Sequence, residues 1–320
     1  MRLARTSGIA ARLISVLITL FGISVFIFIV LRVIPGDTIT GSLGIETGVL
    51  TPEQIEDLKR YYGIDKPLIL QYFSWITSFL SGDLGFAYST GVSVLTLTAS
   101  SLPVTIELAL FGTICGVIMG IAIGMFSAKK PGSTRDFLGQ LFGLLALAIP
   151  GFVLSTAIVT IMANKFGYFP NGYEYMTPWE DLWMNLQQML FPSLVLGIAV
   201  AAPVMRTTRS ALLETVDKDF IRTAFGKGLK SRTVQFRHVL RNSMIPIVTM
   251  TGIQFGYLLG GAVIVEKIFA LPGMGRQILD AINKREYATV QSSVMIFAIL
   301  FVTINLVTDL IYRRIDPRIK

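Results

Sequence analysis

Residues that commonly build metal, redox and catalytic centres are scarce in this sequence of 320 residues. There is one cysteine, Cys115, and one histidine, His238. A lone cysteine excludes an intrachain disulfide and a cysteine cluster, and a lone histidine excludes a site with several histidine ligands. The sequence also contains neither the P-loop pattern for ATP nor the H-E-x-x-H pattern for zinc. We therefore expect no catalytic residue, no metal site and no cofactor bound by this chain.

Charged residues are scarce as well, at 15% of the chain against about 25% in an average soluble domain, while 52% of the residues are hydrophobic. Such a chain is expected in a bilayer, where a helix needs about 20 mostly apolar residues to cross. The first candidate span is too long for a signal peptide, and Pro192 and Pro203 interrupt the fourth. We predict an all-α polytopic membrane protein with six transmembrane helices, at 13–31, 102–127, 138–163, 190–207, 244–265 and 289–311.

The distribution of positive charge predicts the orientation of these spans. With the N-terminus in the cytoplasm, most of the 28 Lys and Arg residues fall in inside segments, as the positive-inside rule requires. Both termini are then cytoplasmic, and a basic loop beside a membrane needs no nucleic acid to explain it. The predicted parts are an N-terminus with the first span (1–31), an extracytoplasmic helical loop (32–100), a core of five spans (101–311) containing a cytoplasmic loop (206–243), and a cytoplasmic tail (312–320).

The extracytoplasmic loop has two helical patterns. One helix is expected over 51–63, where acids fill the first turns and Gly63 follows. A second pattern places apolar residues at helical spacing around Trp75. We expect a small helical cap on the outer interface, and leave open whether it contacts the substrate or only packs as a lid.

Within the spans, glycines recur at every fourth residue, which lets another helix backbone approach closely. The alternative to plain helix packing is a sliding or gating contact; the residues are Gly112, Gly116, Gly120 and Gly124 in the second span and Gly252, Gly256 and Gly260 in the fifth. The carboxylates inside the predicted spans are Glu107 and Asp309, both near helix ends. A central carboxylate for a proton or sodium relay is therefore missing, so we expect energy to enter from elsewhere.

The loop 206–243 is basic and too polar to cross the membrane. Its pattern predicts a helix over about 208–216, a second from Asp217 or Asp219 to Lys227, and a turn at Gly228. A third helix would start at Ser231, with an apolar stripe formed by Phe236, Val239, Leu240 and Met244. A merely solvated topogenic loop is the alternative.

The stretches "DFIRTAFGKGL" (219–229) and "RHVLRNSMIP" (237–246) resemble the cytoplasmic loop of permease subunits from bacterial ATP-driven (ABC) importers. The general form of that loop has Glu-Ala where this sequence has Arg222-Thr223, and a proline where this sequence has Arg241. Both differences resemble the sequences of the dipeptide, oligopeptide and nickel branch of the family. Further stretches resemble the B-type permease of that branch almost from end to end: "LRVIPGD" (31–37), "YGIDKPLILQY" (62–72), "GGAVIVEKIFALPGMGR" (260–276) and "DPRIK" (316–320).

The resemblance implies a type I ABC importer permease fold and a role for the loop. The residues that it places against a cytoplasmic ATPase are Asp219, Phe220, Arg222, Thr223, Ala224, Lys227, Gly228 and Leu229, with support from Arg237, His238, Arg241 and Pro246. We expect Ala224 to let this helix approach the ATPase closely. Pro272, Gly273 and Gly275 would lie near an outer gate that faces the binding protein, or else form a structural elbow.

The resemblance also implies partners, location and cargo. The partners would be a second homologous permease, one or two ATPase subunits that carry ATP and Mg²⁺, an extracytoplasmic solute-binding protein and membrane lipid. The chain would be a non-catalytic, multi-pass protein of the bacterial plasma (inner) membrane. Dipeptides and oligopeptides lead as cargo, with nickel, nickel chelates, oligosaccharides or opines as alternatives. The rival functions are a self-sufficient channel or secondary carrier, and a membrane enzyme or assembly factor.

Overall fold

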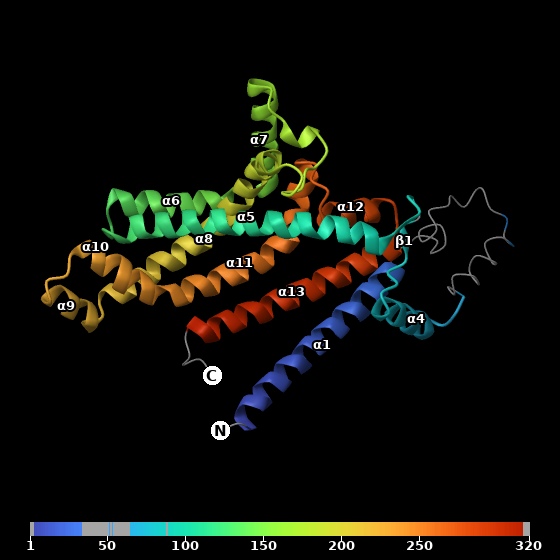
Figure 1. Ribbon diagram of the computed structural model, residues 1–320, viewed down its shortest axis with the longest axis horizontal. Helices are drawn as coiled ribbons and strands as arrows, with labels where there is room; N and C mark the ends of the chain where they lie inside the picture. The colour runs from blue at the N-terminus through green and yellow to red at the C-terminus, as the bar shows by residue number, and fades with distance from the viewer. Residues whose placement is uncertain (1–2, 34–50, 52, 54–64, 88, 316–320) are drawn as a thin grey trace. The chain divides into compact units, whose positions relative to one another are not determined.

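A computed structural model describes residues 3–33, 51, 53, 65–87 and 89–315 of the chain (Figure 1). Most of the predicted helix over 51–63 (residues 52 and 54–63) and the end of the predicted tail, 316–320, lie outside the described residues. The chain divides into two compact units. The first holds residues 1–103 and 276–303, and the second holds 104–275 and 304–320.

The described part of the chain is built from long apolar helices, as predicted. Five are long and apolar enough to cross a membrane: α1 (Leu3–Val33), α5 (Val94–Ala128), α8 (Leu182–Val216), the stretch that ends in α11 (Arg241–Ile268), and α13 (Tyr287–Ile315). A sixth crossing results if the bent pair α6 (Thr134–Ala148) and α7 (Gly151–Phe166) counts as one span. The expectation of a helical protein with six membrane crossings is confirmed in this sense.

The third predicted span, 138–163, is not one straight helix. α6 and α7 meet at an angle of 93°, which makes this segment a broken span or a re-entrant loop. Pro150 causes the break, because a proline disfavours the helical conformation of the residue before it. Ile149 is accordingly extended, with φ −85° and ψ 116°, and α7 starts afresh after Pro150.

The fourth span differs from the prediction in the opposite direction. α8 continues through both Pro192 and Pro203 and on to Val216, so the separate helix expected over 208–216 is the last part of α8. Prolines are tolerated inside membrane helices when neighbouring groups satisfy the freed backbone. α8 is also the most buried of the candidate spans, with 67% of its apolar window covered by other parts of the structure.

In the first unit, the short helix α4 (Leu68–Leu80) packs on α1. The hydroxyls of Ser24 and Tyr72 lie 2.8 Å apart, and Trp75 packs against a buried cluster made by Ile27, Leu31, Ala281 and Val290. Strands β1 (Phe86–Ala87) and β2 (Val92–Ser93) form an antiparallel hairpin. The Ser292 hydroxyl of α13 donates to the Leu84 carbonyl, 3.0 Å away, and so holds the start of this hairpin.

The second unit is centred on α8, which packs against α6, α7 and α11. α5 runs along α8 through its glycines: Gly112, Gly116, Gly120 and Gly124 face Leu196, Val200, Val204 and Thr208 in turn. A Cβ at Gly260 of α11 would meet no described atom within 4 Å. At Gly260 the expected glycine contact is therefore not made by the described part of this chain, whereas Gly256 of the same helix is buried.

Candidate functional site

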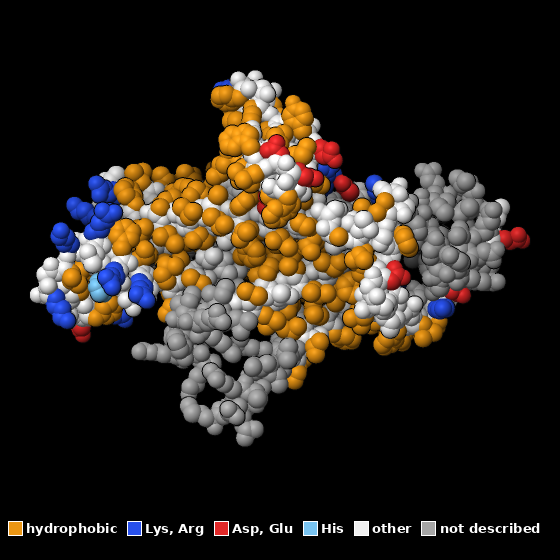
Figure 2. Space-filling view, viewed as in Figure 1, with side chains coloured by type: hydrophobic (Ala, Val, Ile, Leu, Met, Phe, Trp, Pro, Cys, Tyr) orange, Lys and Arg blue, Asp and Glu red, His pale blue; other side chains and the backbone are white. Residues whose placement is uncertain are grey.

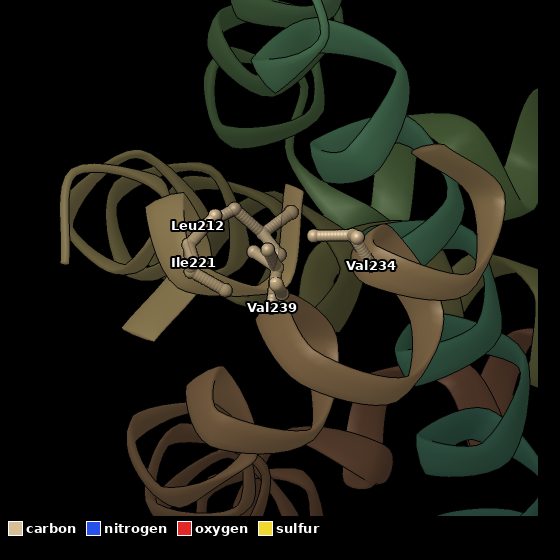
Figure 3. Close-up of a cluster of buried hydrophobic side chains, with 5 residues drawn as sticks. Leu212, Ile221, Val234 and Val239 are labelled. Atoms are coloured by element: carbon tan, nitrogen blue, oxygen red, sulfur yellow. The ribbon is translucent and has the colours of Figure 1, made fainter. Parts of the chain in front are cut away.

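The loop 206–243 carries helix α9 (Asp219–Gly226), which sits on a buried apolar base. Ile221 and Ala224 are 1% and 6% exposed and pack against Leu212 of α8. Val234 and Val239 complete the cluster from the segment that follows α9, and Figure 3 shows these side chains converging. Burial of this face fixes α9 against the end of α8, since each buried aliphatic side chain contributes about 1.5–3 kcal/mol.

The residues of α9 outside this base, and those that directly follow the helix, are exposed and combine apolar with charged groups, among them the Asp219 carboxylate, which is paired with Arg222. Phe220, Phe225 and Leu229 are 44%, 50% and 38% exposed. Arg222, Thr223 and Lys227 are exposed beside them, and Figure 2 shows Lys and Arg side chains gathered over this region. We call the set Phe220, Arg222, Thr223, Phe225, Lys227 and Leu229 the α9 outer face. The expectation that Ala224 faces a partner is wrong, because its side chain is buried in the base.

Gly228 ends α9 in the way that the sequence predicts. Its φ is +77°, in the left-handed region that only glycine adopts without strain. The Gly228 amide donates to the Phe225 carbonyl at 2.9 Å, and the Leu229 amide donates to the Ala224 carbonyl at 3.3 Å. The requirement at this position is conformational, because a Cβ would meet no described atom within 4 Å.

The third helix of the loop starts at Ser231 as expected, with α10 (Ser231–Thr233), and continues as a π-helix, η2 (Val234–Leu240), before α11. The i→i+5 bonding of a π-helix puts residues five apart on one face. Val234 and Val239 are therefore the buried pair, and Phe236, expected on the apolar stripe, is half-exposed. Of the predicted supporting residues, Arg237, Arg241 and Pro246 are exposed and His238 is partly exposed.

The predicted outer gate is organised around a carboxylate that the sequence analysis placed outside the spans. Glu266 is fully buried near the end of α11 and accepts a hydrogen bond of 2.7 Å from the Thr105 hydroxyl. Thr105 in turn accepts the Met274 amide at 2.9 Å. A Cβ at Gly273 would overlap the Glu266 carboxylate, and one at Gly275 would lie 2.7 Å from Val263. The glycines are needed here because the chain passes directly over Glu266.

The turn before this gate is made by a residue other than glycine. α11 ends at Ile268, and Ala270 adopts a φ of +56° before Pro272 and the start of α12 (Met274–Asn283). The Leu271 amide donates to the Glu266 carbonyl at 2.9 Å, which closes the helix end. The sequence pointed to Pro272 and Gly273 for this turn, and no residue-type signal marks Ala270.

The second carboxylate of interest, Glu107 of α5, is held by polar side chains. Its Oε2 accepts the Tyr175 hydroxyl at 2.5 Å, and Tyr175 accepts the Asn185 amide at 3.2 Å. Burial, and then the adjacent Glu107, raise the pKa of Tyr175, which therefore stays a hydrogen-bond donor. Among the described residues no three His, Cys, Asp or Glu side chains are grouped as metal ligands.

Comparison with known proteins gives matches along nearly the whole chain. The family described as "Binding-protein-dependent transport system inner membrane component" matches residues 120–320, and its N-terminal counterpart matches residues 7–109. The glutathione transport system permease protein GsiC of Pectobacterium atrosepticum is 36% identical over 319 residues, which covers 97% of each chain. GsiC of Escherichia coli K12 is 34% identical over 309 residues, again with 97% of each chain covered.

Solved structures with the same fold are more distant in sequence. The chain aligns with an amino acid ABC transporter crystallised with histidines at a TM-score of 0.53 and 18% identity, over 68% of this chain and 94% of that one. An inward-facing MetNI methionine ABC transporter aligns at a TM-score of 0.55 and 16% identity, over 69% and 97% of the two chains. At these identities the likeness concerns the fold alone.

Proposed function

The chain belongs to the family of binding-protein-dependent transport system inner membrane components, and from this premise we propose that it forms half of the path of an importer for short peptides. It is a membrane-embedded permease subunit of an ABC importer and is not itself an enzyme. Membership of the family implies ATPase and binding-protein partners. ATP and Mg²⁺ would then be bound by the ATPase subunits, and the other half of the path would be a second, homologous permease in the bacterial inner membrane.

The observation that carries the coupling part of this proposal is the asymmetry of α9. One side is seated on a buried base, so the helix moves as one body with α8 and η2. The exposed surface of α9 presents the rings of Phe220 and Phe225 together with Arg222, Lys227 and Asp219, and aromatic and arginine side chains are common anchors in protein interfaces. A groove on an ATPase that is apolar at its centre and acidic at its rim fits this face. Closure of the ATPases would then displace α9.

Short peptides are the proposed cargo for two reasons. The relatives that match over the whole chain are named as glutathione permeases, and glutathione is a tripeptide. The sequence motifs resemble the dipeptide and oligopeptide branch. The test is ligand binding by the cognate solute-binding protein, with glutathione, alanyl-alanine, trialanine and a nickel chelate as probes. Binding of a peptide supports the proposal, and binding of the chelate alone would replace peptide by metal complex as the cargo.

The coupling role is tested by co-purification. The tagged chain would be expressed with its cognate second permease and ATPase subunits, and retention of the ATPases measured. We expect the ATPases to be retained by the wild type and to bind about 30-fold more weakly to Phe225→Ser, as for a hot spot of about 2 kcal/mol. Phe236→Ser is the matched control, because Phe236 is also 50% exposed but lies on η2. Equal retention by both variants would exclude the α9 outer face as the docking surface.

A further inference from the structure

The first turn of α6 holds a buried carboxylate that the sequence analysis did not single out. Asp136 is 2% exposed and accepts the Ser127 hydroxyl of α5 at 2.6 Å and the Gly132 amide at 2.9 Å. Gln140 donates to it from the next turn at 3.0 Å. These contacts fold the end of α5, the turn 129–133 and the start of α6 into one rigid piece, which we call the α5–α6 hairpin.

The hairpin is joined to α8 by an ion pair with fixed geometry. Arg209 donates through Nε to one oxygen of Asp136 and through Nη2 to the other, both at 2.7 Å. A guanidinium fork that engages both carboxylate oxygens sets the orientation as well as the distance of the two helices. Asp136 is buried and Arg209 partly exposed, and such a pair is weak evidence for stability by itself, because the cost of desolvating the charges offsets their attraction. The fixed distance and orientation that the pair imposes on α6 and α8 are the stronger evidence that it has a role.

The position of Arg209 on α8 relates this pair to α9. Arg209 lies one turn before Leu212, and Leu212 forms the buried base of α9 with Ile221 and Ala224. The same base is touched from the hairpin by Met125 and Ala128 of α5. Figure 1 shows the start of α6 and α9 at the same end of the second unit. Besides the packing of α5 and α6 along α8, the hairpin is therefore linked to the base of α9 by an apolar contact and by the Asp136–Arg209 pair.

These two connections differ in what they can transmit. Apolar contacts are non-directional and allow packed helices to slide over one another by small shear movements. The bidentate pair has one preferred arrangement, and sliding α8 along α6 would leave a buried charge without its partner. The pair, while intact, therefore fixes the direction in which a displacement of α8 moves the start of α6.

We propose that Asp136 and Arg209 are positioning residues for transport, which carry the ATP-driven displacement of α9 into α5 and α6. The inference rests on the proposed coupling role of α9. It assigns the pair to the conversion of ATP hydrolysis into movement of the spans, and assigns neither residue to contact with the ATPase or the cargo.

The test compares transport per ATP hydrolysed in proteoliposomes that contain the full importer and its binding protein, with radiolabelled glutathione as the probe. The double variant Asp136→Asn/Arg209→Met removes both charges while keeping side chains of similar size. Arg209→Lys keeps the charge but not the fork, and Arg135→Gln removes an exposed charge from the same hairpin as the control. Only assembled complexes are compared, so a lower yield does not enter the ratio.

We expect the double variant to hydrolyse ATP but to transport at least about fivefold less glutathione per ATP, the lower end of measured couplings between sites. Arg209→Lys should fall between it and the wild type, and Arg135→Gln should match the wild type. A wild-type ratio in the double variant would overturn the inference and leave the pair as a structural clamp. Failure of the ATPases to bind the wild-type chain would instead refute the proposed function.

A second measurement does not depend on the cargo. In the wild-type complex, trapping the ATPases with ADP and vanadate after ATP hydrolysis should change the hydrogen exchange of both α9 and residues 129–140. In Arg209→Lys and in the double variant, the change should be confined to α9. An unchanged response of residues 129–140 in the variants would also overturn the inference.

Discussion

Gly116 of α5 lies directly on Val200 of α8, so that a Cβ built at position 116 would lie 2.5 Å from the Cβ of Val200 and 2.7 Å from the Gly197 carbonyl oxygen. A Cβ built at Gly197 would in turn lie 3.2 Å from the amide nitrogen of Gly116. The two helix backbones therefore meet without intervening side chains. This contact positions α8, and through α8 the base on which α9 sits.

Gly116→Ala is expected to destabilise the assembled permease by about 1–3 kcal/mol, because the added methyl group overpacks a contact between two backbones. The measurement is the midpoint of thermal unfolding in detergent, followed by tryptophan fluorescence. Gly260→Ala is the control, since a Cβ there meets no described atom within 4 Å. Equal midpoints for the two variants would contradict the close α5–α8 contact.

Gly228→Val should leave membrane insertion intact and uncouple ATP hydrolysis from transport, because valine resists the φ of +77° that ends α9. Strain of this kind costs about 1–3 kcal/mol, enough to change how α9 is held. Gly228→Asn is the matched variant, since asparagine tolerates the left-handed region. Uptake and ATP hydrolysis would be measured side by side. Normal uptake by the valine variant would show that the turn at Gly228 does not matter for coupling.

Ile221→Ala should loosen α9 without removing its outer face. The lost methyl groups leave a cavity beside Leu212, and such truncations cost about 2–5 kcal/mol. We expect faster hydrogen exchange across 219–226, while Val216→Ala, an exposed aliphatic at the end of α8, leaves exchange there unchanged. If α9 exchanges at the same rate in both variants, the buried base does not hold it in place.

Glu266→Gln tests the packing of the outer gate. The amide keeps the shape of the side chain but replaces an acceptor oxygen by a donor, which leaves a buried polar group unmatched at a cost of about 1–3 kcal/mol. Exchange of the amides from Phe269 to Met274 should rise and uptake should fall. The exposed Glu214→Gln serves as the control. A variant that behaves as wild type in both measurements would show that the carboxylate is not needed to hold the chain above it.

The membrane helices could be predicted from sequence because long apolar runs and the positions of Lys and Arg are local signals. The end of α9 could be predicted for the same reason, since Gly228 is a chemical marker of its own conformation. The sequence shows a proline at position 150, but whether a proline breaks a membrane helix depends on the residues around it. Pro150 lies at the break between α6 and α7, whereas Pro192 and Pro203 lie inside a continuous α8. Sequence alone does not supply those neighbours.

The missed residues are those whose roles depend on distant partners. Asp136 and Arg209 are 73 positions apart, and Glu266 and Thr105 are 161 apart, so no spacing rule joins them. The π-helix over Val234–Leu240 changed the buried face that a 3.6-residue period predicts for the loop. Ala224 was assigned to a partner because it lies in the motif, whereas its place in the buried base follows from packing against α8.

The most direct test of the account is uptake by proteoliposomes of defined composition, because the account holds that this subunit moves its cargo only when a partner ATPase displaces α9. Vesicles that contain this chain with its second permease, ATPases and binding protein should accumulate labelled glutathione or trialanine when ATP is supplied to the ATPases, and vesicles with the chain alone should accumulate neither. Strong uptake by the chain alone, without any ATPase present, would contradict it.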